Sequence, residues 1–260
     1  MQTDQLSAVI ITYNEEKNIG RCLRSLAGVA DEMIVLDSFS TDNTVAIARK
    51  YGAVVHQSEF EGYGTQKNTA LELCTGNAVL FVDADEMLSP DLSMLILKEK
   101  KEGFPADGYS MNRLTNFCGQ WIRHGSWYPD RKLRIIKNKK GKWNQALVHE
   151  AIIMNSESVI KHLRADLMHY SYDSVEELVN KNNHYSSLSA KTLHTAGKRT
   201  SRLRLFINPT WAFIYNYIFR LGFLDGLNGF IIAVNLSYFT FQKHMKLLML
   251  QESHKKGSKA

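Results

Sequence analysis

Two aspartates separated by one alanine, Asp83-Ala84-Asp85, directly follow the apolar run 78–82. Such a run predicts a buried strand, and the carboxyl ends of strands form the edge at which open α/β sheets bind ligands. Two carboxylates at that edge are hard oxygen ligands of the kind that Mg²⁺ or Mn²⁺ takes when it carries a diphosphate. The competing interpretation is a solvated turn whose acids precede the start of a helix.

The segments before this pair alternate between strand and helix patterns. Short apolar runs rich in β-branched residues predict strands, and apolar residues at helical spacing predict helices. Gly52 and Gly76 are helix stop signals, and Asn14 is a candidate N-cap for the first helix. The predicted strands are 7–12, 33–36, 53–56 and 78–82, and the predicted helices are 15–26, 45–50 and 65–74. This alternation predicts a mostly parallel sheet with right-handed crossovers.

The composition is that of a folded protein with an anionic partner. The 260 residues, 44% of them hydrophobic, can bury a full core as one large domain or as one domain with an appendage. The net charge of +6 indicates an anionic partner without identifying it. The three cysteines have neither paired nor metal-ligand spacing, so we expect them to be reduced. The polar residues 1–5 lead directly into a strand, and we expect no signal peptide.

Four blocks of the sequence follow one another in a characteristic order. They are residues 9–15 (VIITYNE), 37–44 (DSFSTDNT), 66–68 (QKN) and 83–85 (DAD). In these blocks the chain resembles family 2 glycosyltransferases with the GT-A fold. Within that family it is most similar to the small lipopolysaccharide enzymes that add glucose to the inner-core heptose, the β-1,4-glucosyltransferases. The resemblance covers residues 7 to about 90 and continues more loosely beyond them.

The resemblance implies a fold and a domain organisation. The fold is α/β and Rossmann-like, with a mostly parallel sheet and helices on both faces. The GT-A catalytic domain is expected over 1–172, with a nucleotide-sugar half of about 1–90 and an acceptor half of about 91–172. Residues 173–260 are expected to form a helical extension.

The resemblance also assigns residues to the nucleotide-sugar. Asp37 ends the second predicted strand, where a carboxylate can accept from a base N–H or a ribose hydroxyl; the alternative is an acid that caps the following turn. In the family, the first aspartate of the acidic pair contacts the sugar of the nucleotide and the second holds the metal, which correspond to Asp83 and Asp85. The other residues expected there are Thr12, Tyr13, Glu15, Lys67, Asn68 and Ala84.

Lys67 and Asn68 start a predicted helix near the same edge, where a cation and a helix N-terminus both favour phosphate. A solvated helix face is the alternative for Lys67. His169 is the candidate for a further metal ligand, because GT-A enzymes often recruit a residue late in the sequence; its alternative is a merely hydrogen-bonded histidine. The expected cofactor is therefore a divalent cation, Mg²⁺ or Mn²⁺, held by Asp85 and His169.

The middle third carries candidates for the acceptor side. Residues 107–113 alternate as a strand does, and a loop rich in aromatic and polar residues, Trp127 among them, is a candidate wall for a sugar ring; core packing is the alternative. Residues 131–136 predict a second strand, on which Arg131 and Arg134 point to opposite faces, so at most one of them enters the site.

Residues 143–150 resemble the Val-His-Glu block of these glucosyltransferases. Direct transfer with inversion needs a base that takes the proton of the acceptor hydroxyl, and Glu150 is the candidate. His149 points to the opposite face and has a structural role in this interpretation. The alternative for Glu150 is a glutamate on a surface strand.

The last third has helical patterns and the composition of a membrane-surface element. Ser174 and Glu177 form a capping box that opens a helix through about Thr195, ended by Gly197. Basic residues in 198–204 precede apolar and aromatic stretches, each shorter than the roughly 20 residues that span a bilayer. Such helices lie in the interface of anionic membranes. The alternative is a helical pair that packs against the catalytic domain or another subunit.

Together these features predict an inverting, metal-dependent glycosyltransferase, peripheral on the cytoplasmic face of the inner membrane. It is expected to move a hexose, glucose by the resemblance, from a UDP-sugar to a lipopolysaccharide or lipooligosaccharide inner-core acceptor. The expected partners are the UDP-sugar, a lipid-linked saccharide and an anionic membrane surface, without nucleic acid; an oligomer is compatible with the sequence. The alternatives are transfer to a polyprenyl phosphate and a non-catalytic basic binding module.

Overall fold

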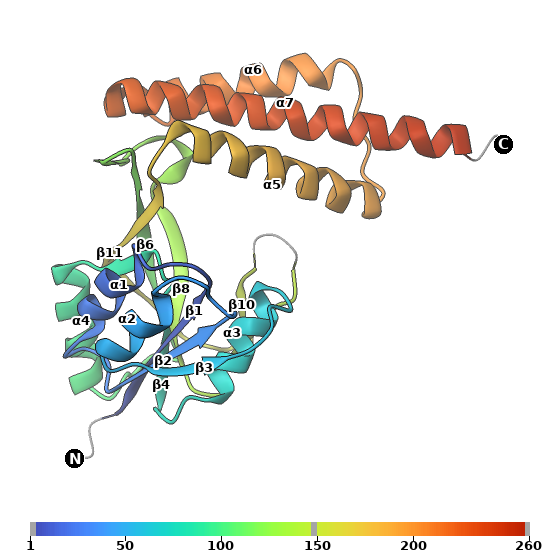
Figure 1. The fold of residues 1–260 in the computed structure, drawn as a ribbon. Coiled ribbons are helices and arrows are strands. Elements are labelled where there is room, and N and C mark those ends of the chain that lie inside the picture. The colour runs from blue at the N-terminus through green and yellow to red at the C-terminus, as the bar shows by residue number, and fades with distance from the viewer. Residues whose placement is uncertain (1–3, 147–149, 258–260) are drawn as a thin grey trace. The chain divides into compact units, whose positions relative to one another are not determined.

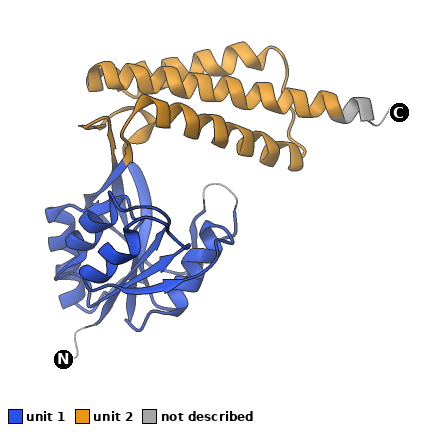
Figure 2. Cartoon of the chain, viewed as in Figure 1, with its two compact units in different colours: residues 1–114, 130–170 blue, residues 115–129, 171–260 orange. Residues whose placement is uncertain are grey.

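The chain forms two compact units in a computed structural model that describes residues 4–146 and 150–257 (Figure 2). Unit 1 contains the chain up to Leu114 together with Asp130–Tyr170, and unit 2 contains Thr115–Pro129 together with Ser171–Ala260. The later break lies close to the domain boundary expected after residue 172. Residues 115–129, which the sequence places in the catalytic domain, belong instead to unit 2, because their loop is hydrogen-bonded to its helices.

The parallel half of the unit 1 sheet contains the four predicted strands in the order β3-β2-β1-β4. Their bounds are β1 Leu6–Thr12, β2 Glu32–Asp37, β3 Val54–Gln57 and β4 Ala78–Phe81. The connecting helices are α1 Ile19–Leu26, α2 Thr44–Lys50 and α3 Tyr63–Glu72 (Figure 1). All four strands run in the same direction, so their carboxyl ends meet at one edge, as the sequence predicts.

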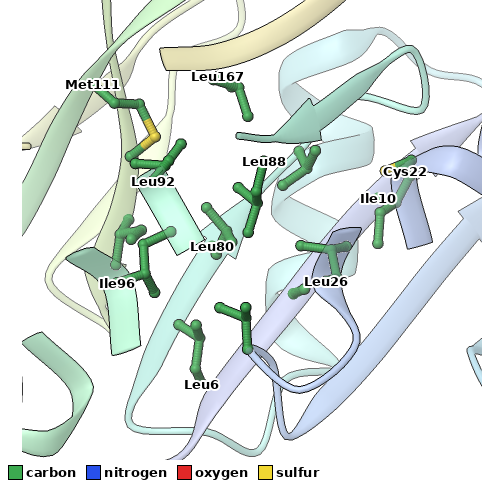
Figure 3. Packing of buried hydrophobic residues seen from close by; sticks show 14 of the residues in the cluster. Leu6, Ile10, Cys22, Leu26, Leu80, Leu88, Leu92, Ile96, Met111 and Leu167 are labelled. Carbon is green, nitrogen blue, oxygen red and sulfur yellow. The ribbon is translucent and has the colours of Figure 1, made fainter. Parts of the chain in front are cut away.

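Strand β1 lies inside this half because both of its faces are apolar. Leu6 and Ile10 are buried in one hydrophobic cluster, together with Cys22 of α1, whereas Val9 is buried in a second cluster. Figure 3 shows the first of these clusters. Alternate residues of a strand point to opposite faces, so the two clusters mark the two covered sides of the sheet. Residues of α1 and α4 belong to the first cluster and residues of α3 to the second, which gives three layers.

The sheet continues beyond β4 as β8-β6-β11-β5, with the antiparallel pairs β4–β8, β8–β6 and β11–β5. The bounds are β5 Glu86–Leu88, β6 Gly108–Phe117, β8 Asp130–Lys137 and β11 Ile160–Tyr172. Strands β9 Gly141–Trp143 and β10 Ile152–Met154 form a separate two-stranded sheet. Helix α4 Pro90–Lys101 begins at an N-cap, Ser89, whose side chain accepts from the Leu92 N–H.

The predicted N-cap of the first helix is wrong. Helix α1 begins at Ile19 rather than at residue 15, and Asn14 has a left-handed backbone with φ of 54°. Its side-chain oxygen accepts from the Thr41 N–H at 2.8 Å, and its own N–H donates to the Ser40 hydroxyl at 2.8 Å. Asparagine tolerates this conformation because its short polar side chain bonds locally. Asn14 therefore ties the loop after β1 to the loop after β2.

Unit 2 is mainly helical. Helix α5 Val175–Thr195 starts at the predicted capping residue, since the Ser174 hydroxyl accepts from the Glu177 N–H at 3.2 Å. Helix α6 Arg204–Ile214 continues as a π-helical turn η2 Tyr215–Phe219; a 3₁₀ turn η3 Gly222–Asp225 and the long helix α7 Gly226–Gly257 follow. Helix α7 packs against both α5 and α6 (Figure 1). The short strand β7 Gln120–Trp121 and the turn η1 Gly125–Trp127 complete the unit.

Among the described helices, none is individually long and apolar enough for a bilayer crossing. By length and composition alone, one pair meets that criterion jointly: Arg204–Phe219 and Gly222–Ser253, with a bend of 72° between them.

The first turn of α3 lies directly against the backbone of Asn144. A Cβ atom on Gly64 would stand 1.9 Å from the Asn144 carbonyl oxygen, so a larger residue must displace this chain segment. We predict that Gly64→Ala lowers the free energy of unfolding by about 3 kcal/mol, the upper end for overpacking, measured by urea denaturation. Gly20→Ala is the control, because its Cβ would meet only side-chain atoms of Tyr51 and Ile47 at 3.3 Å and 3.4 Å. An equal loss in both variants would contradict the close approach at Gly64.

Candidate active site

The acidic pair lies in the short connection between β4 and β5. The Asp83 N–H donates to the Glu86 carboxylate at 2.9 Å, and the Glu86 N–H donates to the Asp83 carbonyl at 2.9 Å. These reciprocal bonds close a tight turn just beyond the sheet edge. Asp83 and Asp85 therefore lie in this turn, at the carboxyl end of β4, where the sequence predicts them.

Two cations hold Asp83, one on each carboxylate oxygen. Lys67 Nζ lies 2.9 Å from Oδ1, and Arg134 Nη2 lies 2.8 Å from Oδ2. Burial of the carboxylate opposes ionisation, but Arg134 and Lys67 outweigh it and hold the pKa of Asp83 well below its usual value. Asp83 is therefore an anion with a fixed orientation at the edge of the sheet.

Arg134 is itself buried, with 4% of its side chain exposed, and it also contacts Glu86, which is fully buried, at 2.6 Å. Desolvation opposes the charge on Arg134, yet the carboxylates of Asp83 and Glu86 raise its pKa. Arg113 on β6 lies 3.6 Å from the same Glu86 oxygen. Arg134 thus points toward the acidic pair and forms an ion pair with Asp83. A contact of Arg134 with an acceptor stays a prediction.

Asp85 lies beside His169, as the metal hypothesis requires. Strand β11 pairs with β5 in the register that sets His169 opposite Glu86, and His169 Nε2 lies 3.3 Å from Asp85 Oδ2. Within residues 4–146 and 150–253, no group of three or more His, Cys, Asp or Glu side chains could hold a metal ion. The Asp85 carboxylate fits Mg²⁺ or Mn²⁺, which usually keep few protein ligands and complete their shell with phosphate oxygens and water. Metal binding by His169 stays a prediction.

Lys67 connects Asp83 to the candidate base. Its Nζ lies 3.3 Å from Glu150 Oε1 and 4.4 Å from the centre of the Trp143 ring, and its side chain is buried. The solvated-face alternative for Lys67 is therefore wrong. Glu150 adjoins residues 147–149, so the predicted role of His149 lies outside the described residues.

Asn68 is bonded to the backbone of Trp143. Its side-chain amide donates to the Trp143 carbonyl at 2.9 Å and accepts from the Trp143 N–H at 2.9 Å. Both polar ends of the amide are used in this pair, so Asn68 fastens β9 to α3 and thereby holds Trp143 over Lys67. A contact of Asn68 with a phosphate stays a prediction.

The loops after β1 and β2 contain the other predicted nucleotide residues. Thr12 pairs with Asp37 in the sheet register, and the Thr12 hydroxyl is buried without a hydrogen-bond partner among the described residues, as a group awaiting a polar ligand would be. Asp37 is fully buried and accepts from the Ser40 hydroxyl, the Ser40 N–H and the Gln57 amide. These bonds fit the alternative in which Asp37 caps the turn after β2. Contact of Asp37 with a nucleotide stays a prediction.

The remaining three nucleotide candidates differ in accessibility. Tyr13 is exposed, which suits an aromatic face offered to a base. The Glu15 N–H donates to the Thr44 hydroxyl at 2.7 Å, and its carboxylate accepts from the Asn18 amide. Ala84 is buried between the two aspartates, so it can offer only its backbone to a ligand. Nucleotide contacts of all three stay predictions.

The acceptor candidates divide between the two units. Arg131 is exposed on β8 in unit 1. Trp127 belongs to unit 2, where it stacks on Tyr172 with ring centres 5.3 Å apart and meets the edge of Phe117 at 6.0 Å. These ring contacts fit the core-packing alternative for Trp127, and its contact with a sugar stays a prediction.

The loop around Trp127 is held by the break between α6 and α7. The Asp225 carboxylate accepts from the His124 N–H at 2.8 Å, and Asn216 accepts from the Ser126 N–H at 3.0 Å. Arg220 donates to the Gly125 and Tyr128 carbonyls, both at 3.2 Å.

Sequence reasoning missed two functional side chains, Glu86 and Arg113. Glu86 follows the acidic pair directly, and a third acid so close to a buried strand is a signal of a cation partner. Arg113 and Arg134 come from neighbouring strands β6 and β8, and their convergence on Glu86 has no local signal in the sequence.

The fold and this edge together define a glycosyltransferase of the GT-A type. The model of the family described as "Glycosyl transferase family 2" matches residues 7–164, and the chain belongs to this family. It is 34% identical to an uncharacterized glycosyltransferase of Rickettsia conorii over 98% of this chain and 93% of that one. It is also 32% identical to the lipopolysaccharide core biosynthesis glycosyltransferase LpsC of Rhizobium meliloti, over 93% of this chain and 91% of that one.

A solved structure agrees at the level of the fold. The mannosyltransferase PcManGT of Pyrobaculum calidifontis, in complex with GDP-Man and Mn²⁺, superposes with a TM-score of 0.57 at 14% identity, over 95% of this chain and 88% of that chain. The predicted family, fold class and enzymatic nature are therefore confirmed.

Removal of the buried cation is expected to be costly. We predict that Arg134→Met destabilises the protein by about 3–5 kcal/mol, because Glu86 then stays buried without its closest partner and Asp83 loses one of two. Urea denaturation measures this loss. Lys132→Met, which removes a more exposed partner of Asp130, is the control and should cost at most about 1 kcal/mol.

The pH dependence supplies a second readout for Arg134. The folded-state pKa of Asp83 is depressed, so its contribution to stability is present above about pH 4, the ordinary range of an aspartate, and is lost as the pH falls through the folded value. Arg134→Met should flatten this acid-side loss. An unchanged acid profile would contradict the role assigned to Arg134.

Proposed function

We propose that the protein transfers a hexose, glucose, from a UDP-sugar to an inner-core saccharide of lipopolysaccharide or lipooligosaccharide, with inversion and with a divalent cation. The observation that carries this proposal is that Lys67 lies within ion-pair distance of both Asp83 and Glu150. The donor-side carboxylate and the candidate base are thus held by one buried cation. The similarity to LpsC, which is named for lipopolysaccharide core biosynthesis, supports the acceptor class.

Glu150 acts as the general base in this mechanism. The acceptor hydroxyl donates its proton to the Glu150 carboxylate while its oxygen attacks the anomeric carbon on the side opposite the diphosphate. The new C–O bond forms as the bond to the diphosphate oxygen breaks, so the configuration inverts and no covalent enzyme intermediate forms. Lys67, 3.3 Å away, orients the Glu150 carboxylate before the hydroxyl arrives.

Asp85 and His169 would hold the divalent cation at the edge of the sheet. When bound there, Mg²⁺ or Mn²⁺ neutralises the negative charge that develops on the departing diphosphate. Asp83 accepts hydrogen bonds from hydroxyls of the nucleotide sugar, since Arg134 and Lys67 keep it ionised and fixed in direction. The exposed ring of Tyr13 and the buried hydroxyl of Thr12 contact the uridine side of the donor.

The place of action follows from the acceptor. A lipid-linked saccharide is confined to a membrane, so the enzyme works at the surface of that membrane, on the cytoplasmic side where nucleotide-sugars are available. Transfer to a polyprenyl phosphate is the competing reaction. Its acceptor is already an anion and needs no base, so a test of Glu150 separates the two.

A donor screen tests the reaction. We expect the purified protein to release UDP from UDP-glucose when Mg²⁺ or Mn²⁺ and an inner-core acceptor are present, and to lose about 100-fold or more of this rate in Asp85→Asn. Asp91→Asn, on the exposed start of α4, is the control and should keep the wild-type rate. Absence of turnover with UDP-, GDP- and other common donors under these conditions would refute the enzymatic proposal.

The base is tested by an isosteric change. Glu150→Gln keeps the shape of the side chain and an oxygen that can accept from Lys67, but it removes the proton acceptor. We expect the kcat to fall by about 10²–10⁴-fold, with little change in donor affinity measured by UDP binding. Glu157→Gln, an exposed neighbour in the same region, is the matched control. Retention of most activity in Glu150→Gln would favour the polyprenyl-phosphate reaction.

A further inference from the structure

Unit 2 exposes large apolar side chains along one stretch, residues 203–238. On α6 and η2, Phe206, Trp211 and Phe219 are among them, and Phe206 is 71% and Trp211 56% exposed. On α7, Leu227, Phe230 and Tyr238 continue the pattern, with Leu227 at 73%. We call these six residues the apolar stripe. On α7 the spacings of three and eight residues follow the helical repeat, so this helix presents its three members of the stripe on one side.

The other side of the same helices is the packing side. Pro209 and Asn216 on α6 and η2 are buried, and so are Ile232 and Ala233 on α7. Each helix therefore has an inward face that packs in the interior of unit 2 and an outward face that also carries large apolar side chains. A soluble surface rarely exposes so many large apolar side chains unless it binds something.

The charges beside the apolar stripe identify the kind of partner. Residues 178–251 contain nine Lys and Arg but a single acid, Asp225. That acid is buried and bonded to His124, so it does not offset the positive charge at the surface. Exposed cations, Arg199, Arg202 and Arg204, stand at the start of α6, directly before the stripe. A partner that is both apolar and anionic fits this surface, and a second copy of the chain would bring like charges together.

We propose that the apolar stripe inserts into the headgroup region of an anionic lipid bilayer, with α6 and the first half of α7 lying in the plane of the interface. Tryptophan and tyrosine favour this depth because their rings are apolar and their N–H or O–H groups stay hydrated. Trp211 and Phe219 also support each other, with ring centres 5.7 Å apart. Basic residues at the edge bind lipid phosphates.

Lipid binding by this surface gives a physical reason for the hydrogen bonds that hold the loop around Trp127. Asn216, Arg220 and Asp225 all lie in the break between the two lipid-facing helices, and all three bond to the loop 123–128. A loop fixed to the lipid-bound element stays close to the headgroups. This consequence for the acceptor rests on the proposed function, whereas lipid binding itself does not.

Vesicle sedimentation of the full chain tests the proposal. We expect the wild type to bind vesicles of phosphatidylcholine with phosphatidylglycerol, to bind phosphatidylcholine alone weakly, and to be released at about 1 M salt, where the screening length is ~3 Å. The double variant Phe206→Glu/Leu227→Glu should bind at least about ten-fold more weakly, because two apolar side chains no longer enter the lipid. Arg202→Gln/Arg204→Gln should lose roughly five-fold per residue. Met94→Glu, which changes a similarly exposed residue of unit 1 (62%), should bind as the wild type does.

A spectroscopic measurement guards against misfolding of these variants. Brominated lipids should quench the tryptophan fluorescence of the wild type, and the quenching should largely disappear in Trp211→Phe. Failure of the wild type to bind anionic vesicles, undiminished binding by Phe206→Glu/Leu227→Glu, or resistance of the bound protein to alkaline extraction would each overturn the proposal. A lipid-free dimer that this double variant dissociates would assign the stripe to a second copy of the chain.

Activity in solution separates this proposal from the proposed function. Transfer to a soluble acceptor fragment without vesicles should be equal in the wild type and in Phe206→Glu/Leu227→Glu. Loss of vesicle binding with intact turnover supports both proposals together. Turnover without any vesicle binding by the wild type refutes only the lipid proposal.

Discussion

A buried arginine between two carboxylates is the interaction on which the active-site edge depends. Arg134 contacts both Asp83 and Glu86 and is almost completely removed from water. Desolvation of three charged groups is unfavourable, and it is tolerated only because each charge finds an opposite charge and hydrogen bonds within a few ångströms. The result is a carboxylate at position 83 that stays ionised and has one orientation. A carboxylate on a solvated turn would have neither property.

The antiparallel half of the sheet makes this arrangement possible. Arg134 comes from β8, Arg113 from β6 and His169 from β11, and all three face the turn that follows β4. Strand β5 pairs with β11 and so returns the chain after Asp85 directly to the sheet. The four parallel strands supply the edge, and the antiparallel strands supply the groups that set its charge.

Lys67 extends the network from Asp83 to Glu150, the candidate base. It bridges Asp83 and Glu150, and Asn68, its neighbour in sequence, holds Trp143 over it through two bonds to the Trp143 backbone. A single turn of α3 therefore supplies one ammonium group that contacts both carboxylates. Catalysis by positioning depends on this kind of rigidity, because misplacement of a reacting group by about 1 Å can cost ~100-fold in rate.

The parallel strands, their helices and the acidic pair at the end of β4 could all be predicted from the amino-acid sequence, because apolar periodicity and turn residues are local signals. The sequence also marked Lys67, Glu150 and His169 as candidates. In the structure Lys67 contacts Asp83, His169 contacts Asp85, and Glu150 contacts Lys67. The sequence did not predict the partners of Glu86, Arg113 and Asn68 or the membership of residues 115–129 in unit 2. These depend on contacts between segments far apart in the chain, and the pairing of charges across strands leaves no periodic trace in either strand.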